Sequence, residues 1–149
     1  MKKWILLVVT LCMIFTGCSN SSKAFTFNVE TGDEIKVKLD TTDGKYDLVP
    51  EGSRFSIMDN DNEIIAQGIF ILPEYYDSYV AAAVEYEHIT GEKDGNTYIL
   101  YQYVDDTHTE NNYVIDIVDA DTAVIIASVA DKTIVQEIFE LLTISVDVD

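Results

Sequence analysis

Short runs of alternating apolar and polar residues, separated by turn residues, constrain the fold of this chain most. In Glu34–Asp40 (EIKVKLD), three apolar side chains alternate with two lysines, which is typical of a strand with one buried face. Asp43-Gly44 is a favoured hairpin dipeptide, and the other connections are also short. Short turns favour antiparallel pairing. The further predicted strands are 24–29, 46–49, 55–57, 64–72, 97–104, 112–118 and 122–129, with a short one expected after 143.

Two segments have helical spacing instead. Pro73 is suited to the first helical position, and the apolar side chains that follow it lie at i, i+3, i+4, i+7 and i+8, so a helix is predicted over about 73–87. Asp131 is a candidate N-cap for a second helix over about 131–142. Together the patterns predict an α+β domain in which two helices pack on one antiparallel sheet of about six to seven strands. Gly68 is a candidate bulge position in its strand.

The order of these elements over roughly residues 46–146 resembles the Mog1/PsbP-like α-β-α sandwich. It also resembles small uncharacterised lipoproteins of Gram-positive bacteria. The resemblance rests on element order and on no signature motif. It implies a sandwich-like arrangement and a domain that binds other proteins or assists their complexes, although a fold alone assigns no function.

The first residues have the pattern of a secretory signal peptide. Lys2 and Lys3 precede an apolar run over 4–15, which is much shorter than the roughly 20 residues that a membrane-spanning helix needs. Small residues then lead to Gly17-Cys18. A signal peptide over 1–17 is therefore predicted.

The sequence around Cys18 resembles the lipobox of bacterial lipoproteins, with Phe15 in place of the usual Leu. The resemblance implies a diacylglyceryl group on Cys18. The small polar residues that follow predict a flexible tether over 18–23. The length of the remaining chain predicts a single globular domain over 24–149. The resemblance to the lipobox also implies attachment to the extracytoplasmic face of the cell membrane through the lipid anchor. The alternative is a secreted protein that carries a cysteine near its cleavage site.

The chain is acidic, with a formal net charge of −18 at pH 7. Loss of residues 1–17 would remove Lys2 and Lys3, leaving seven basic residues against 27 acidic ones and a charge of −20. Such a charge argues against nucleic-acid binding, which requires a basic surface. The acidic residues are spread along the chain, so they either solvate its faces or form a patch for cations or a basic partner.

No catalytic residue and no cofactor is predicted. The two histidines are His88, at the end of the first predicted helix, and His108, in an acidic loop. The sequence contains no G-x-S-x-G motif and no G-x-G phosphate loop. Its two cysteines, one of them in the leader, leave no pair for a disulfide in the mature chain. Glycoside hydrolysis by a pair of carboxylates stays an alternative, because acidic residues are so frequent in the chain.

One acidic turn is a candidate metal site. Asp59, Asp61 and Glu63 have the spacing at which an EF-hand loop begins, but Ile64 stands where that loop needs Gly. The alternative is an ordinary polar hairpin turn. The loop over 105–110 is a second candidate of the same kind. A zinc site is not expected from two distant histidines.

Tyrosine is abundant, with nine copies. Strand alternation places Tyr101 and Tyr103 on one face of their strand and Tyr98 on the other. Exposed tyrosines are frequent contact residues at interfaces, so Tyr101 and Tyr103 are a candidate interaction surface; the alternative is that these rings cover the core. The favoured hypothesis is a lipid-anchored accessory domain that binds another envelope protein. Calcium binding is the alternative, and a wall or sugar hydrolase comes third.

Overall fold

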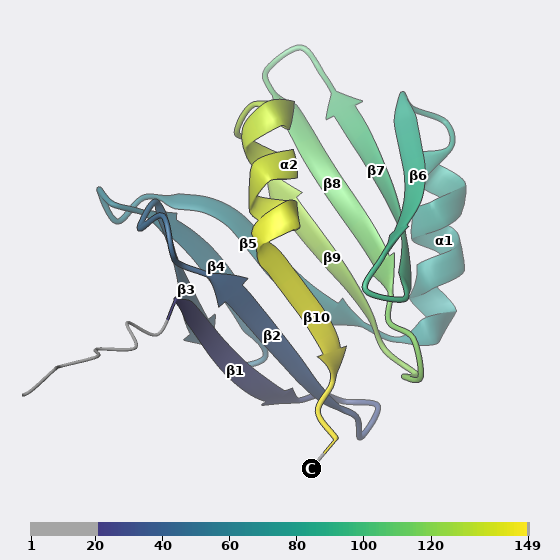
Figure 1. The fold of residues 1–149 in the computed structure, drawn as a ribbon. Coiled ribbons are helices and arrows are strands. Elements are labelled where there is room, and N and C mark those ends of the chain that lie inside the picture. Colours follow the sequence, from purple (N-terminus) through teal and green to yellow (C-terminus); the bar gives the residue numbers. More distant parts are fainter. Residues whose placement is uncertain (1–20, 149) are drawn as a thin grey trace, which may run out of the picture.

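The computed structural model describes residues 21–148, which form ten strands and two helices (Figure 1). The predicted α+β class is confirmed. In chain order the elements are β1 Ser22–Asn28, β2 Glu34–Asp40, β3 Tyr46–Glu51, β4 Arg54–Asp59, β5 Ile64–Ile71, α1 Pro73–Ala83, β6 His88–Lys93, β7 Asn96–Val104, β8 Thr109–Asp116, β9 Ala123–Ser128, α2 Lys132–Leu141 and β10 Leu142–Val146. The leader and Cys18 lie outside the described residues.

The strands form two antiparallel sheets, so the prediction of one sheet was wrong. The larger sheet has the order β3-β4-β5-β9-β8-β7-β6, and the smaller has the order β1-β2-β10. Strand β10 pairs with β2, which places Leu142 opposite Leu39. Alternation in a sequence identifies a strand but does not identify its partner, and this pairing joins segments about a hundred residues apart.

The elements lie on both faces of the larger sheet (Figure 1). Helix α1 packs on one face, where Ala83 contacts a cluster that includes Ile99, Val114 and Ile125. Helix α2 and the smaller sheet pack on the other face, around the main core. That core contains Phe55 of the larger sheet and Phe139 of α2. Burial of apolar surface at roughly 25 cal/mol per Å² is the main force that holds these layers together.

Helix α1 is shorter than predicted, because it ends at Ala83 and not near residue 87. The N–H groups of Glu85 and Tyr86 bond to Ala82 and Ala83 in tight terminal turns. The carbonyl of Glu87 then accepts the N–H of Gln102 on β7. Pairing with β7 therefore overrides the helical pattern from this point, and His88 begins a strand instead of ending a helix.

Four further predictions from the sequence can be compared with the structure. Pro73 opens α1 as predicted, and α2 lies within one residue of its predicted bounds at each end. Asp131 holds the N-cap position, but its side chain makes no capping hydrogen bond. The irregularity between β4 and β5 falls at Ile57 and Met58 instead of at Gly68.

The N-terminal boundary also differs. Strand β1 begins at Ser22, two residues before the predicted start of the domain, and the Lys23 ammonium lies 2.7 Å from the Asp47 carboxylate. The Ser21 carbonyl accepts the N–H of Thr41. Among the described residues, no helix is long and apolar enough to cross a membrane.

Candidate functional site

Four aromatic rings gather on the α1 side of the larger sheet. Tyr86 stacks on Tyr101 with ring centroids 5.9 Å apart, and it meets Tyr103 edge-on at 5.5 Å. The ring of His108 lies 5.9 Å from that of Tyr103. Glu110 of β8 is paired with Tyr103 of β7. These five residues are called the tyrosine surface below.

The local sequence explains why these rings meet. Tyr101 and Tyr103 are two residues apart on β7, so they point to the same face of the sheet. Tyr98 points to the other face, where its ring contacts Phe139 and Tyr113. The predicted separation of Tyr98 from the other two is therefore confirmed.

The loop between β7 and β8 holds His108 beside Tyr103. One oxygen of the Asp105 carboxylate accepts the N–H and the hydroxyl of Thr107, each at 2.7 Å, and the N–H of His108 at 3.0 Å. These bonds, with the Thr107 side chain contributing most, hold the pKa of Asp105 well below its usual range. The acidic loop that was a candidate cation site thus uses its first carboxylate to shape its own backbone.

Burial and negative charge act together on Tyr101. Desolvation raises the pKa of Tyr101, and the neighbouring Glu110 carboxylate raises it further. Tyr101 and Tyr103 are partly buried, whereas Tyr86 is 37% exposed and His108 is exposed. The surface therefore offers ring edges, tyrosine hydroxyls and one carboxylate, which suit contact with an amphipathic or basic group.

An open hollow of about 170 Å³ adjoins this surface at Glu110. Its apolar lining includes Ile64, which is 48% exposed, and Val129, which is 70% exposed. Gln67 and Ala127 also line it. Large exposed apolar side chains around one hollow extend the candidate contact area beyond the rings.

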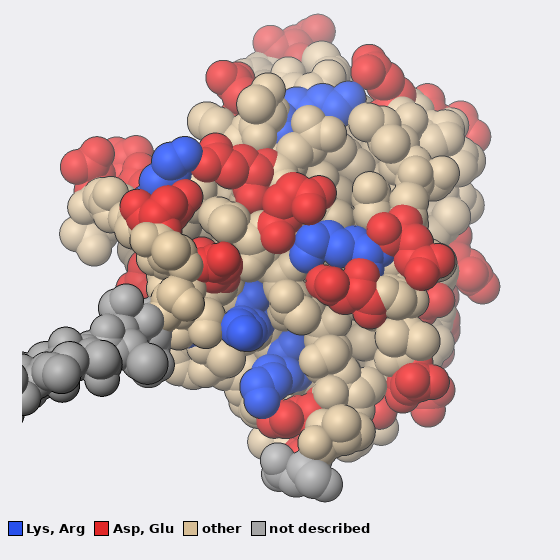
Figure 2. All heavy atoms as spheres, viewed as in Figure 1, with Lys and Arg blue, Asp and Glu red and all other residues tan. Residues whose placement is uncertain are grey.

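None of the ion pairs that involve Lys or Arg in the described residues includes one of the five residues of the tyrosine surface, although Glu87, the partner of Lys132, directly follows Tyr86. On the face that carries α2 and the smaller sheet, basic and acidic side chains are intermixed (Figure 2). Intermixed charge is typical of a solvated face. The Nδ1 atom of His108 lies 3.1 Å from the Asp105 carboxylate.

The candidate metal residues lie in the β4–β5 turn. One carboxylate oxygen of Asp59 accepts the N–H groups of Asp61 and Glu63, at 2.9 and 3.0 Å. Asp59 and Asp61 both line an open hollow of about 330 Å³ beside Tyr46. Within residues 21–148, no group of three or more His, Cys, Asp or Glu side chains is arranged to hold a metal ion. Asp59 thus shapes the hairpin turn.

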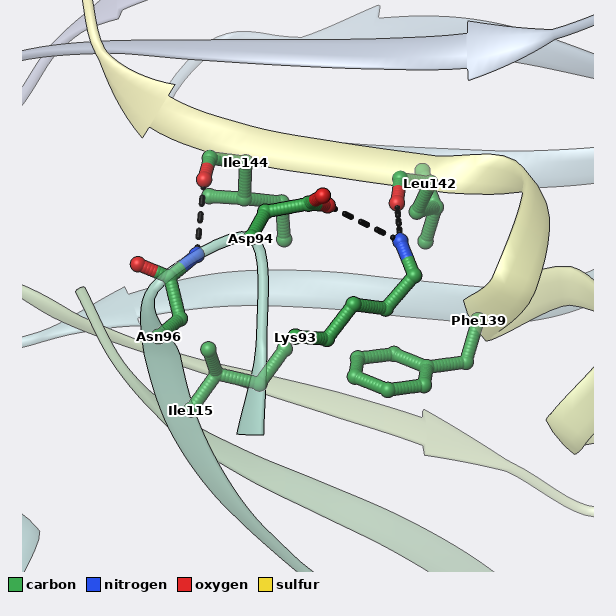
Figure 3. Close-up of a pocket in the computed structure, with 7 residues that line it drawn as sticks. All are labelled: Lys93, Asp94, Asn96, Ile115, Phe139, Leu142 and Ile144. Atoms are coloured by element: carbon green, nitrogen blue, oxygen red, sulfur yellow. Dashed lines mark hydrogen bonds and ion pairs between the residues drawn. The ribbon is translucent and has the colours of Figure 1, made fainter. Parts of the chain in front are cut away.

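A third and smaller pocket has a structural role. Lys93 and Asn96 reach from the β6–β7 hairpin to β10, where their side chains donate to the carbonyls of Leu142 and Ile144 (Figure 3). The pocket between them has a volume of about 10 Å³, which is room for about one water molecule. Since α2 has no basic residue in its last turn, the Lys93 ammonium supplies the positive charge that its C-terminus favours.

The sequence suggests Tyr101 and Tyr103 as a surface but does not indicate which rings adjoin them. It predicts Tyr86 within a helix and His108 in an acidic loop, whereas in the structure Tyr86 follows α1 and stacks on Tyr101, and His108 lies beside Tyr103. The Asp94-Gly95 dipeptide, with positive φ at both residues, was the signal that would have revealed the β6–β7 hairpin. Recognising that hairpin would have placed Tyr86 near Tyr101.

No protein-family model and no curated protein matches this chain.

Proposed function

We propose that this chain is a lipid-anchored accessory domain on the extracytoplasmic face of a cell membrane, and that it binds a basic segment of another envelope protein through the tyrosine surface. The observation that carries the proposal is the cluster of partly exposed rings, Tyr86, Tyr101, Tyr103 and His108, beside the Glu110 carboxylate. In this proposal the domain acts by recognition and not by catalysis.

The chemistry of the surface supports a basic partner. An Arg or Lys side chain can lie against a tyrosine ring while its charge meets a carboxylate, and such cation–π contacts contribute about 0.5–2 kcal/mol. None of the Lys or Arg ion pairs among residues 21–148 involves Glu110. The apolar hollow beside Glu110 can receive the stem of the same side chain or its neighbour.

The sequence of the leader supports the anchor. Cys18 follows the lipobox-like Phe15-Thr16-Gly17, and only three residues separate it from β1 at Ser22. The Cα atoms of Cys18 and Ser22 can therefore be at most about 14 Å apart. Two acyl chains on Cys18 would hold the domain close to the lipid surface, since one chain alone binds only marginally. The α-β-α sandwich-like arrangement remains a prediction from element order.

Site-specific photo-crosslinking in cells tests the recognition. A photoreactive phenylalanine analogue replaces Tyr103 in one full-length variant and Thr143, an exposed residue on the outer face of β10, in the control. The proposal expects a discrete adduct with a second protein from position 103, and it expects Glu110→Lys to reduce that adduct at least fivefold. The same adducts from both positions, or no adduct from position 103, would refute it.

Cell fractionation tests the anchor separately. Wild type should sediment with membranes and lose its leader, whereas Cys18→Ala should lose the lipid and remain unprocessed or leave the membrane. A Cys18→Ala product that is processed as wild type and still sediments with lipid contradicts the anchor. Neither of those fractionation results depends on Tyr103.

A further inference from the structure

Strand β6 forms an open edge of the larger sheet. It pairs with β7, and within residues 21–148 no second strand pairs with it. Ile89 on this strand is 42% exposed. An edge strand presents unpaired N–H and C=O groups that can accept another strand.

The ladder shows which backbone groups are free. The N–H of Gln102 bonds to the carbonyl of Glu87, and bonding positions alternate along an antiparallel pair. Ile89, Gly91 and Lys93 therefore direct their backbone groups toward β7. His88, Thr90 and Glu92 direct theirs away from the sheet, so three consecutive bonding positions face outward.

Two of the other sheet edges, those of β3 and β10, are occupied or blocked. Strand β3 carries Pro50, which cannot donate a hydrogen bond, and its Asp47 is paired with Lys23 of β1. The carbonyls of Leu142 and Ile144 on β10 already accept bonds from the β6–β7 hairpin. Strand β6 has neither a proline nor such a cover.

The sequence of β6 is complementary to itself in the antiparallel direction. If Thr90 lies opposite Thr90 of a second copy, then His88 lies opposite Glu92 and Ile89 lies opposite Gly91. The outward-bonding positions 88, 90 and 92 then meet one another, as an antiparallel ladder requires. A protonated His88 would pair favourably with Glu92 of the second copy, and this contact occurs twice because of the symmetry.

The Ile–Gly pair is equally well matched in shape. A Cβ atom on Gly91 would lie 2.5 Å from the Tyr98 hydroxyl, so the Tyr98 side chain already covers this glycine. The exposed side chain of Ile89 from the second copy would lie beside Gly91 and against that ring. Association would therefore bury the Ile89 side chain, which is exposed in a single copy.

We propose that two copies of this chain associate through β6, with Thr90 at the twofold axis, to form one continuous antiparallel sheet. Helix α1 does not block this arrangement, because it packs over β7 and β8. With strands about 4.8 Å apart, the two α1 helices would lie about 19 Å apart across the axis. Packed helices approach to 8–10 Å, so they would not collide.

Cysteine cross-linking of the full chain in membranes tests the proposal. Opposed residues at a hydrogen-bonded antiparallel position have Cα atoms about 5.5 Å apart, which is within the range of a disulfide. Thr90→Cys, oxidised or treated with a short bismaleimide, should give a species of twice the mass. Thr97→Cys, an exposed position on β7, is the matched control and lies at least about 14 Å from its symmetry mate.

Charge variants on the exposed strand provide an independent readout. His88→Glu in the Thr90→Cys background would oppose Glu92 with a second carboxylate, and the cross-linked fraction should fall at least fivefold. His88→Glu with Glu92→Lys restores opposite charges and should restore the dimer. If Thr90→Cys links no better than Thr97→Cys, if it links to a protein of another mass, or if the double variant fails to recover, the proposal is overturned.

Discussion

The ring of Phe55 occupies the space into which a Cβ atom on Gly68 would project, and that atom would lie 2.0 Å from the Phe55 Cζ. The two residues are directly opposed on β4 and β5. Phe55 is fully buried, and its ring forms a triangle with the rings of Phe27 and Phe70, each at a centroid distance of 6.0 Å from it. Gly68 is therefore needed for packing, and not for a bulge.

Gly68→Ala should destabilise the protein by about 1–3 kcal/mol, because the added methyl group must displace a ring that has no free space around it. Urea denaturation followed by circular dichroism measures the change. In a Phe55→Leu background the same substitution should cost less than half as much, since Leu vacates the contested space. An equal cost in both backgrounds would show that the two residues do not interact in this way.

Asn96 connects three segments that are distant in sequence. Its side-chain amide donates to the Ile144 carbonyl at 2.7 Å, and its oxygen accepts the N–H of Val118 at 2.9 Å. Asn96→Asp should lower the free energy of unfolding by about 2–4 kcal/mol at pH 7, because it loses the donor and places a carboxylate against a buried carbonyl. Asn28→Asp on the exposed face of β1 is the control and should change it by less than about 0.5 kcal/mol. Similar losses in both variants would contradict this role.

Asp33 makes the stability of the folded protein depend on pH, and the contacts of its carboxylate determine the sign of that dependence. The Thr122 hydroxyl, at 2.7 Å, is the largest cause that lowers the pKa of Asp33, and Thr31 and the Asp121 N–H add to it. The unfolded chain then binds the proton more readily, so this contribution to stability is full above about pH 4 and is lost as the pH falls through the lower, folded-state pKa.

Asp33→Asn should therefore cost about 1–2 kcal/mol at pH 7 and less at pH 2, because the contribution of the Asp33 carboxylate is no longer full below about pH 4. Thermal unfolding at both pH values checks this. Asp121→Asn is the control, because the backbone and not the side chain of Asp121 takes part in the contact. A difference between Asp33→Asn and wild type that stays constant from pH 7 to pH 2 would argue against a charge-dependent contact.

The sequence patterns located most elements because alternation and helical spacing are local properties. Alternation in Glu34–Asp40 predicted β2 with its buried face, and Pro73 marked the start of α1. Strand β6 escaped prediction because an exposed edge strand such as HITGEK has no apolar face to alternate. The pairing of β2 with β10 is a tertiary property, which no local pattern encodes.

The loop between β7 and β8 holds His108 in the tyrosine surface. Asp105→Ala removes the acceptor of the Thr107 and His108 N–H groups, so the amide hydrogens of both residues should exchange with solvent at least tenfold faster. The Asp105 carboxylate, whose pKa is lowered by these bonds, should keep them intact in wild type down to pH values below its ordinary range.

Asp106→Ala is the matched control, because Asp106 is an equally exposed neighbour in the same loop. Hydrogen exchange measured by NMR should show no comparable acceleration there, and the melting temperatures of the two variants should agree. If exchange at residues 107 and 108 is unchanged in Asp105→Ala, the loop is held by other contacts, and His108 does not depend on this carboxylate for its place beside Tyr103.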